Sequence, residues 1–276
     1  MNSAKIAAFA AILCAALLSA PTASAQFFQQ GPKLVGTGAS GIAEQGAVAL
    51  SADGNTAIVG GPSDNSNVGA VWVYTRSGGV WTQQGPKLVG TGASGSALQG
   101  NSVALSADGN TAIVGGLGDN ASVGAVWVYT RTSGVWTQQG PKLVGTGASG
   151  SAQQGAVALS ADGNTARVGG RADNSLAGAV WVYTRSGGVW TQQGPKLVGT
   201  GAIGSAFQGY SVALAVDGNT AIVGGLGDSA SVGAVWVYAY AAPQPTTPVP
   251  ALGWDAMLAL GALLAGLGLL RLRRRG

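Results

Sequence analysis

The chain has no histidine, and its one cysteine, Cys14, lies among the first 25 residues. The rest of the chain therefore has no disulfide, no zinc site built from cysteine or histidine, and no histidine-based catalysis. Glu44 is the only glutamate, and charged residues make up only 9% of the chain. No nucleophile and base are marked as a pair, so the sequence predicts a protein that is not an enzyme and has no cofactor.

Basic residues are also scarce outside the two ends. The net charge of +4 comes from Lys5, Asp255 and the four arginines near residue 276, because residues 26–240 carry equal numbers of acidic and basic side chains. A nucleic-acid surface needs clustered basic charge, so no nucleic-acid partner is predicted. The 48 glycines and the low charge favour an all-β chain of short strands and tight turns.

Residues 1–25 have the pattern of a secretory signal peptide. Lys5 precedes an apolar run over residues 6–20, and the small residues 23–25 follow it. We expect a signal helix that is cleaved between Ala25 and Gln26, which exports the protein; the alternative is a buried N-terminal helix.

The C-terminal end predicts a membrane anchor. A proline-rich linker (241–250) leads to an uncharged apolar run (256–270), which approaches the length of a spanning helix when residues 251–254 are added. A basic cluster follows it and should stay on the cytoplasmic side: Arg271, Arg273, Arg274 and Arg275. The segment 251–276 is thus a predicted transmembrane anchor with an arginine-rich stop. A helix lying on the membrane is disfavoured, because the run has no polar stripe.

This tail resembles the C-terminal sorting signals of Gram-negative surface proteins, of the IPTL-CTERM and PEP-CTERM type. The matching positions are Val249, Pro250, Leu252 and Trp254. The spacing from leucine to tryptophan is one residue shorter than in that signature, and its glutamate is missing. The resemblance implies recognition by a membrane protease of the exosortase type. It leaves open whether the tail is removed, releasing the protein, or stays as the anchor.

Internal repetition dominates the residues between the ends. The hexapeptide Gly-Pro-Lys-Leu-Val-Gly begins at Gly31, Gly85, Gly140 and Gly194. The first repeat predicts four strands, at residues 47–51, 56–60, 69–76 and 80–89. Asp53-Gly54 marks the first hairpin turn. Pro86 interrupts the fourth strand, which should therefore lie at a sheet edge. This order is that of a β-propeller blade.

The strand count predicts how the propeller closes. Residues 27–35 match only the fourth strand, and the last repeat stops at its third strand, near Tyr240. Sixteen strands make four blades of four if the N-terminal strand pairs beside Val235–Tyr238, which removes an open sheet edge. The alternative is the assembly of two chains into a larger ring.

The repeats resemble the FG-GAP repeat of integrin α-subunits and of many exported bacterial proteins. The Gln-Gly pairs that begin at Gln45, Gln99, Gln154 and Gln208 stand where that family has Phe-Gly. The resemblance covers residues 26–240 and implies a β-propeller, although that family's usual ring has more blades. Its calcium loop is reduced here to one carboxylate per repeat, at Asp53, Asp108, Asp162 and Asp217. We therefore interpret these residues as turn formers, with calcium binding as the less favoured alternative.

Three further sets of residues are candidates for a site. A second acidic position recurs in the loop after the second strand, at Asp64, Asp119, Asp173 and Asp228. Two tryptophans recur in each of three repeats, and their fixed strand positions favour packing over carbohydrate binding: Trp72, Trp81, Trp127, Trp136, Trp181 and Trp190. Arg167 and Arg171 replace apolar residues in the third repeat, either by drift or as a contact site.

The sequence thus predicts an exported, non-enzymatic β-propeller at the cell surface. It would bind an unidentified extracellular ligand or partner, in adhesion or in a matrix. The alternatives are a purely structural component of the envelope or biofilm and, with less support, a propeller-type enzyme acting on glycans.

Overall fold

The structure is a computed structural model, and it describes residues 26–240. The predicted signal peptide, linker, sorting motif and anchor lie outside the described residues, so these interpretations stay predictions. Gln26, the residue after the predicted cleavage point, is exposed. Within residues 26–240, no helix is long and apolar enough to cross a bilayer.

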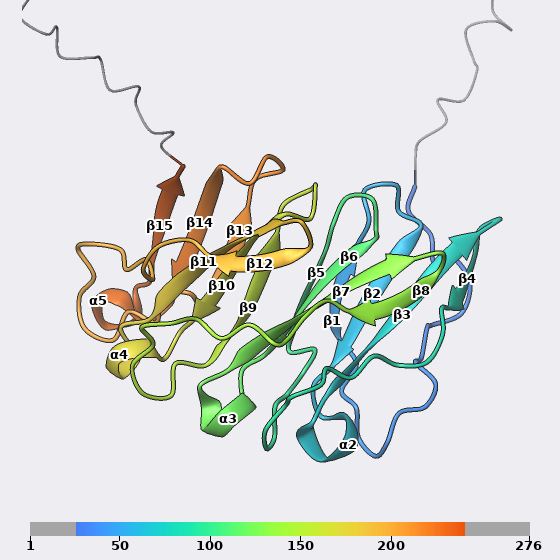
Figure 1. Ribbon diagram of the computed structural model, residues 1–276, viewed down its shortest axis with the longest axis horizontal. Helices are drawn as coiled ribbons and strands as arrows, with labels where there is room; N and C mark the ends of the chain where they lie inside the picture. Colours follow the sequence, from blue (N-terminus) through green and yellow to red (C-terminus); the bar gives the residue numbers. More distant parts are fainter. Residues whose placement is uncertain (1–25, 241–276) are drawn as a thin grey trace, which may run out of the picture. The chain divides into compact units, whose positions relative to one another are not determined.

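Each repeat forms one antiparallel sheet, and the all-β prediction is confirmed (Figure 1). The first sheet has β1 (Ala47–Leu50), β2 (Thr56–Gly61), β3 (Ala70–Ser77) and β4 (Val80–Gln83). The second has β5 (Ser102–Leu105), β6 (Thr111–Gly116), β7 (Ala125–Thr132) and β8 (Val135–Gln138). The third has β9 (Gln154–Leu159), β10 (Thr165–Gly170), β11 (Ala179–Ser186) and β12 (Val189–Gln192). The last has only β13 (Ser211–Leu214), β14 (Thr220–Gly225) and β15 (Ala234–Ala239).

A four-residue turn joins the second and third strands of each sheet. These turns are α2 (Asp64–Asn67), α3 (Asp119–Ser122), α4 (Asp173–Leu176) and α5 (Asp228–Ser231). They are not regular helices, because their two central residues have left-handed φ angles, as in Asn65 (52°) and Ser66 (55°). All four turns lie along the same edge of the molecule (Figure 1).

The strand boundaries follow the predicted ones to within one or two residues, except in the fourth strand. β4 pairs with β3 only as far as Gln83, and the chain then leaves the ladder at Gly85-Pro86. It returns for a single antiparallel bridge between Leu88 and Val71. The interruption and the edge position are confirmed, and the reason is that proline has no backbone N–H to donate.

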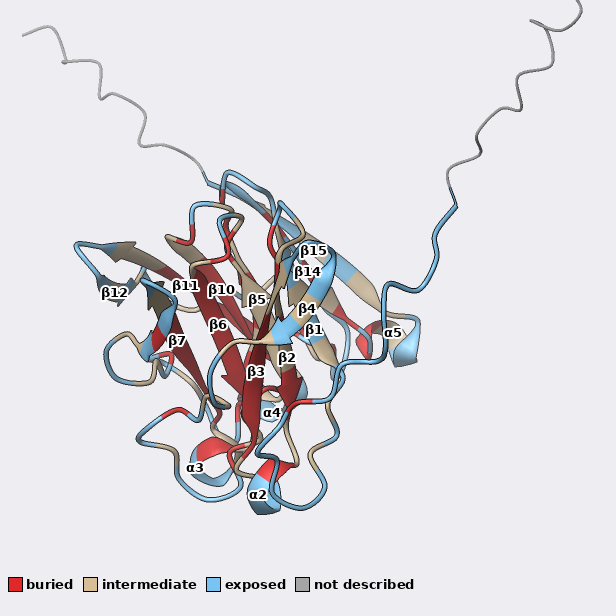
Figure 2. Cartoon of the chain, turned by 90° about the vertical axis from the view of Figure 1, so that its right-hand side faces the viewer, coloured by how far each residue is buried: buried red, intermediate tan, exposed pale blue. Residues whose placement is uncertain are grey.

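The sheets stand side by side as blades do. The first strands β1, β5, β9 and β13 lie next to one another on the inner side; β9 is mostly buried, β5 is half-buried, and β1 and β13 are partly exposed. The middle strands carry the core, which Figure 2 shows in red along β2, β3, β6 and β10. The core clusters join neighbouring sheets: Ile58 and Val73 of the first sheet pack with Val114 and Trp127 of the second.

Glycine permits this close packing between sheets. A Cβ on Gly60 would overlap the carbonyl group of Gly100 in the next repeat. In the second and third sheets, a Cβ on Gly115 or Gly169 would overlap the carbonyl group of Gly155 or Gly209 in the same way. The first glycine of the pair that ends β2, β6 and β10 is therefore a requirement of the junction between sheets, whereas a Cβ on the second would meet the tryptophan of its own sheet.

The predicted closure of the ring is not found, which corrects that prediction. Residues 27–35 form no strand, and β15 is paired only with β14. The residues described therefore contain fifteen strands, not sixteen, and the last sheet stays three-stranded. The physical reason lies in the junctions, which are nearly identical. They repeat the same bridges and glycine contacts, and after three of them the first and last sheets stand at opposite ends of the row (Figure 1). We call this row of four sheets the open array.

Candidate functional site

The recurring acidic side chains of the turns do lie along one edge, as predicted, but they do not face solvent. Asp64, Asp119 and Asp173 are 0% exposed, and Asp228 is 6% exposed. Each accepts a hydrogen bond of 2.7 or 2.8 Å from a backbone N–H of the preceding loop, donated by Ser40, Ser94, Ser149 and Ile203 respectively. These carboxylates hold the loop to the turn, and the three that are 0% exposed are not available to a ligand.

Three of these carboxylates are also paired with a lysine. The lysine of the hexapeptide reaches back to the turn of its own sheet, and its ammonium nitrogen lies 2.5 Å from the carboxylate in each pair. The pairs are Lys87–Asp64, Lys142–Asp119 and Lys196–Asp173. A buried carboxylate is stable only when its charge is compensated, so the lysine and the N–H donor together explain how it is tolerated.

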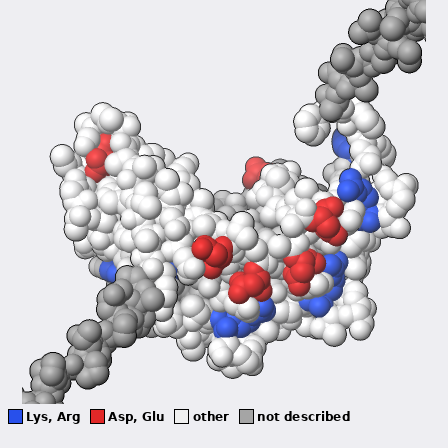
Figure 3. All heavy atoms as spheres, turned by 90° about the horizontal axis from the view of Figure 1, so that it is seen from above, with Lys and Arg blue, Asp and Glu red and all other residues white. Residues whose placement is uncertain are grey.

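The hairpin aspartates are turn formers, as predicted. Asp53 accepts hydrogen bonds from the Ser51 hydroxyl (2.5 Å) and from the backbone N–H of Asn55 (2.9 Å). These bonds favour the ionised form and lower the pKa of Asp53 from its usual 3.8 to about 2. Among residues 26–240, no group of three or more side chains with metal-binding atoms comes together. Figure 3 shows charges of both signs lying close together on one face, with no large patch of one sign.

The tryptophans are packing residues, which confirms that interpretation. Trp72, Trp127 and Trp181 are 0% exposed, and each indole N–H donates a 2.8 Å hydrogen bond to a threonine carbonyl oxygen of the preceding loop. The second tryptophan of each pair lies under an arginine guanidinium, at 5.3 to 5.5 Å from the ring centre. These pairs are Arg76–Trp81, Arg131–Trp136 and Arg185–Trp190.

The two unusual arginines lie at the junction between the third and last sheets. Arg171 donates to the Gln153 side chain at 2.8 Å and stacks on Tyr210 at 5.4 Å. Arg167 is only 7% exposed, and its Nε has no hydrogen-bond partner among the described residues. Burial lowers the pKa of Arg167. Arg171 therefore makes a contact within the chain, whereas nothing in the structure explains why Arg167 replaces isoleucine.

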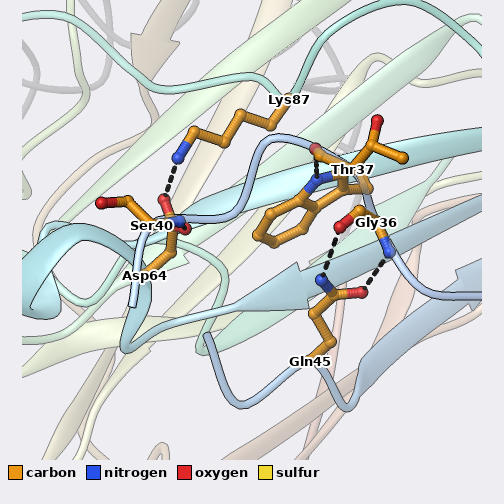
Figure 4. A network of polar contacts seen from close by, with 7 residues as sticks. Gly36, Thr37, Ser40, Gln45, Asp64 and Lys87 are labelled. Atoms are coloured by element: carbon orange, nitrogen blue, oxygen red, sulfur yellow. Dashed lines mark hydrogen bonds and ion pairs between the residues drawn. The ribbon is translucent and has the colours of Figure 1, made fainter. Parts of the chain in front are cut away.

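Sequence reasoning missed the glutamine of each Gln-Gly pair as a structural residue. The Gln45 side chain accepts from the backbone N–H of Gly36 (2.8 Å) and donates to its carbonyl oxygen (3.4 Å). Figure 4 shows this clamp beside the indole that contacts Thr37 and the Lys87–Asp64 pair. Gln99, Gln154 and Gln208 repeat it on their own glycines. Glutamine occupies this position in all four repeats, and this recurrence could have indicated its structural role.

One open pocket lies on the outer face of the last sheet. Its volume is about 400 Å³, and Gly224, Gly225, Gly233 and Val235 are among its lining residues. The equivalent surfaces of the other three sheets are covered by the next repeat, as Gly60 is by Gly100.

Comparison with known proteins finds partial similarities to solved structures, all at low sequence identity. No family model matches the sequence, and no curated protein matches it. The FG-GAP and sorting-tail resemblances therefore stay predictions. The chain is similar to a TolB from Acinetobacter baumannii (14% identity, 70% of this chain and 40% of that one, TM-score 0.42). It is similar to the Kuenenia stuttgartiensis hydrazine synthase (14% identity, 70% and 58%, TM-score 0.44). It is also similar to a protein of unknown function from Desulfotomaculum acetoxidans (14% identity, 71% and 56%, TM-score 0.42). The chain thus spans between 40% and 58% of these solved structures.

Proposed function

We propose that this is an exported, non-enzymatic repeat protein of the cell surface that acts by binding a ligand or partner, in adhesion or in an extracellular matrix. The observation that carries the proposal is the use of the recurring carboxylates inside the fold. The turn aspartates are buried and accept from loop N–H groups, three of them also pair with a lysine, and the hairpin aspartates are bonded within their own turns. Side chains occupied in this way are poor general acids or bases, so binding is favoured over catalysis.

The proposal includes export, anchoring and sorting through the tail. It is supported by the order of the signal pattern, proline-rich linker, apolar run and arginine cluster in the sequence. Intact-mass analysis of the protein from its native envelope tests it. We expect an N-terminus at Gln26, and a mass that is either complete at the C-terminus or shortened near Trp254. A protein that begins at Met1 and fractionates with the cytosol would refute export.

A structural role in the envelope is the second candidate, and the open array favours it. Its first and last sheets each have an uncovered outer face, on which further copies of the chain can pack to build a repeating material. Binding assays with glycans and envelope extracts distinguish the two candidates. Saturable binding would support the first, whereas the lack of any saturable partner would support the second.

A further inference from the structure

The outer face of the last sheet exposes side chains whose equivalents in the first two sheets are buried against the next repeat. In the first sheet, Ile58, Val71 and Val73 are 0 to 1% exposed, because the second repeat covers them. The equivalent residues of the last sheet are Ile222, Val235 and Val237, which are 42%, 64% and 67% exposed. We call this surface, together with Gly224 and Asp228, the C-end face.

The outer face of the first sheet is the other half of such a junction. In β5, Val103 and Leu105 pack towards the first sheet, and Ala104 between them packs towards the third. The equivalents of the outer pair in β1 are Val48 and Leu50, which are 71% and 56% exposed. We call this surface, together with Lys33, Leu34 and Gly46, the N-end face.

The charges left at the two ends are complementary. Three hexapeptide lysines are paired with three turn carboxylates, and the fourth lysine and the fourth carboxylate are Lys33 and Asp228. Neither has an ion-pair partner within residues 26–240. Lys33 is exposed on the N-end face, and Asp228 lies at the C-end face. Together they are the missing fourth pair.

The backbone groups left at the two ends also match. Leu88 and Val71 exchange two hydrogen bonds, of 2.8 and 3.0 Å, and Gln99 and Gly69 form a parallel bridge. The equivalent positions at the two ends are Leu34 with Val235, and Gln45 with Gly233, and no bridge joins either pair within the described chain. The pocket of about 400 Å³ lies where the Gln-Gly pair of a following repeat would sit, since Gly224 corresponds to the covered Gly60.

The N-end face cannot reach the C-end face of its own chain unless the whole first sheet moves. Trp72 donates to Thr37 and Gln45 clamps Gly36, both at 2.8 Å, and these contacts fix residues 36–45 to the first sheet. The first and last sheets stand at opposite ends of the row (Figure 1). A second copy of the chain brings the missing face without any such movement.

We propose that copies of this chain associate head to tail, with the N-end face of one copy seated on the C-end face of the next. Residues 27–35 of one copy then supply the fourth strand that the last sheet of the other lacks, which is a strand addition to an open edge. The contact is heterologous, so it closes into a ring or extends as a filament. The proposal is independent of export, anchoring and any extracellular ligand.

Disulfide cross-linking of the full chain tests this association. The variant carries Cys14→Ser, to remove the native thiol, with Leu34→Cys and Val235→Cys. The equivalent Leu88–Val71 pair exchanges both hydrogen bonds, which places Cα atoms about 5.5 Å apart, within the roughly 4.4 to 6.8 Å that a disulfide spans. We expect covalent dimers or a ladder on a non-reducing gel, in a yield that rises with protein concentration.

Two other outcomes would overturn the proposal. An internal disulfide that leaves only monomers would show that the chain closes on itself, and the absence of any disulfide would show that the faces do not meet. A variant with Val80→Cys and Val189→Cys is the control for cross-links that form by random collision. Both valines lie on edge strands and are 64% and 63% exposed.

Charge and shape variants separate specific docking from misfolding. Lys33→Glu should lower the yield of dimers roughly tenfold, whereas Lys33→Arg, which keeps the positive charge, should leave it nearly unchanged. Gly46→Leu should abolish the dimers while the circular dichroism stays unchanged. In the single chain a Cβ on Gly46 has only the Glu44 carbonyl oxygen nearby, at 3.9 Å, whereas the equivalent Gly100 lies against Ala70 and Gly60. Unchanged dimer yields in both Lys33→Glu and Gly46→Leu would also contradict the proposal.

Discussion

Replacing Asp119 by asparagine tests how much the buried ion pair stabilises each sheet. The carboxylate is 0% exposed and accepts from the Ser94 N–H at 2.8 Å and from Lys142 at 2.5 Å. An amide has one acceptor oxygen, so asparagine can serve only one of these two donors. Breaking a fully buried pair costs roughly 3 to 5 kcal/mol. Because the Lys142 side chain is 21% exposed and can turn partly to water, we expect a loss of about 2 to 4 kcal/mol in the free energy of unfolding.

Denaturant unfolding at low protein concentration measures this loss, since association would raise the apparent stability. Lys142→Met alone should also destabilise, because it leaves a buried carboxylate without its cation. The double variant should be less destabilised than the sum of the two, with a coupling of at least about 1 kcal/mol. Asp228→Asn is the matched control, because this carboxylate has no lysine within the chain's described part. A cost for Asp119→Asn below about 0.5 kcal/mol, or equal to that of the control, would refute the reasoning.

Three other substitutions test single groups. Arg167→Ile restores the residue of the other repeats and removes a buried cation with an unpartnered Nε; we expect a gain of about 1 to 3 kcal/mol in denaturant unfolding. Tyr129→Phe removes a buried hydroxyl that has no partner among the described residues, so its unfolding free energy should be unchanged or higher by about 1 kcal/mol. Because folding lowers the pKa of Asp53 from 3.8 to about 2, its contribution is complete above pH 4 and is lost as the pH falls towards 2; Asp53→Asn should weaken the acid sensitivity of the thermal midpoint over that range.

The sheets could be predicted from the sequence because each signal was local and was repeated four times. The Asp-Gly turn at Asp53, the β-branched and aromatic run at residues 70–77 and the proline at Pro86 each fix one feature of a sheet. Because the same strand and turn pattern recurs four times, the number of units could be counted from the sequence. The packing of Trp72 was also predictable, since its place in the strand never changes.

Closure and the fate of the turn aspartates could not be predicted, because both depend on geometry between distant residues. Whether four sheets close depends on the geometry of each junction, and the contact between Gly60 and Gly100 at the first junction leaves no local signal in the sequence. The burial of Asp64 depends on Lys87, which approaches only after the fourth strand has turned back at Gly85-Pro86. The strand count correctly showed that the last sheet lacks a fourth strand, but it did not fix whether the two ends of one chain meet.

Interchangeable junctions have a consequence that a deletion can test. Removing residues 85–139 joins Gln84 to Gly140 and restores the Gln-Gly-Pro-Lys sequence. One whole repeat is therefore deleted, and the sequence across the new junction is the one that the other repeats have. Stability in repeat arrays is roughly a sum over units and nearest-neighbour junctions. The shortened chain should therefore fold with a lower unfolding midpoint, and both end faces should be intact. Its Leu34→Cys/Val235→Cys form should still give intermolecular cross-links. A shortened chain that folds but no longer cross-links would mean that the ends recognise each other only at a spacing of four sheets, as a ring of fixed size requires and an open array does not.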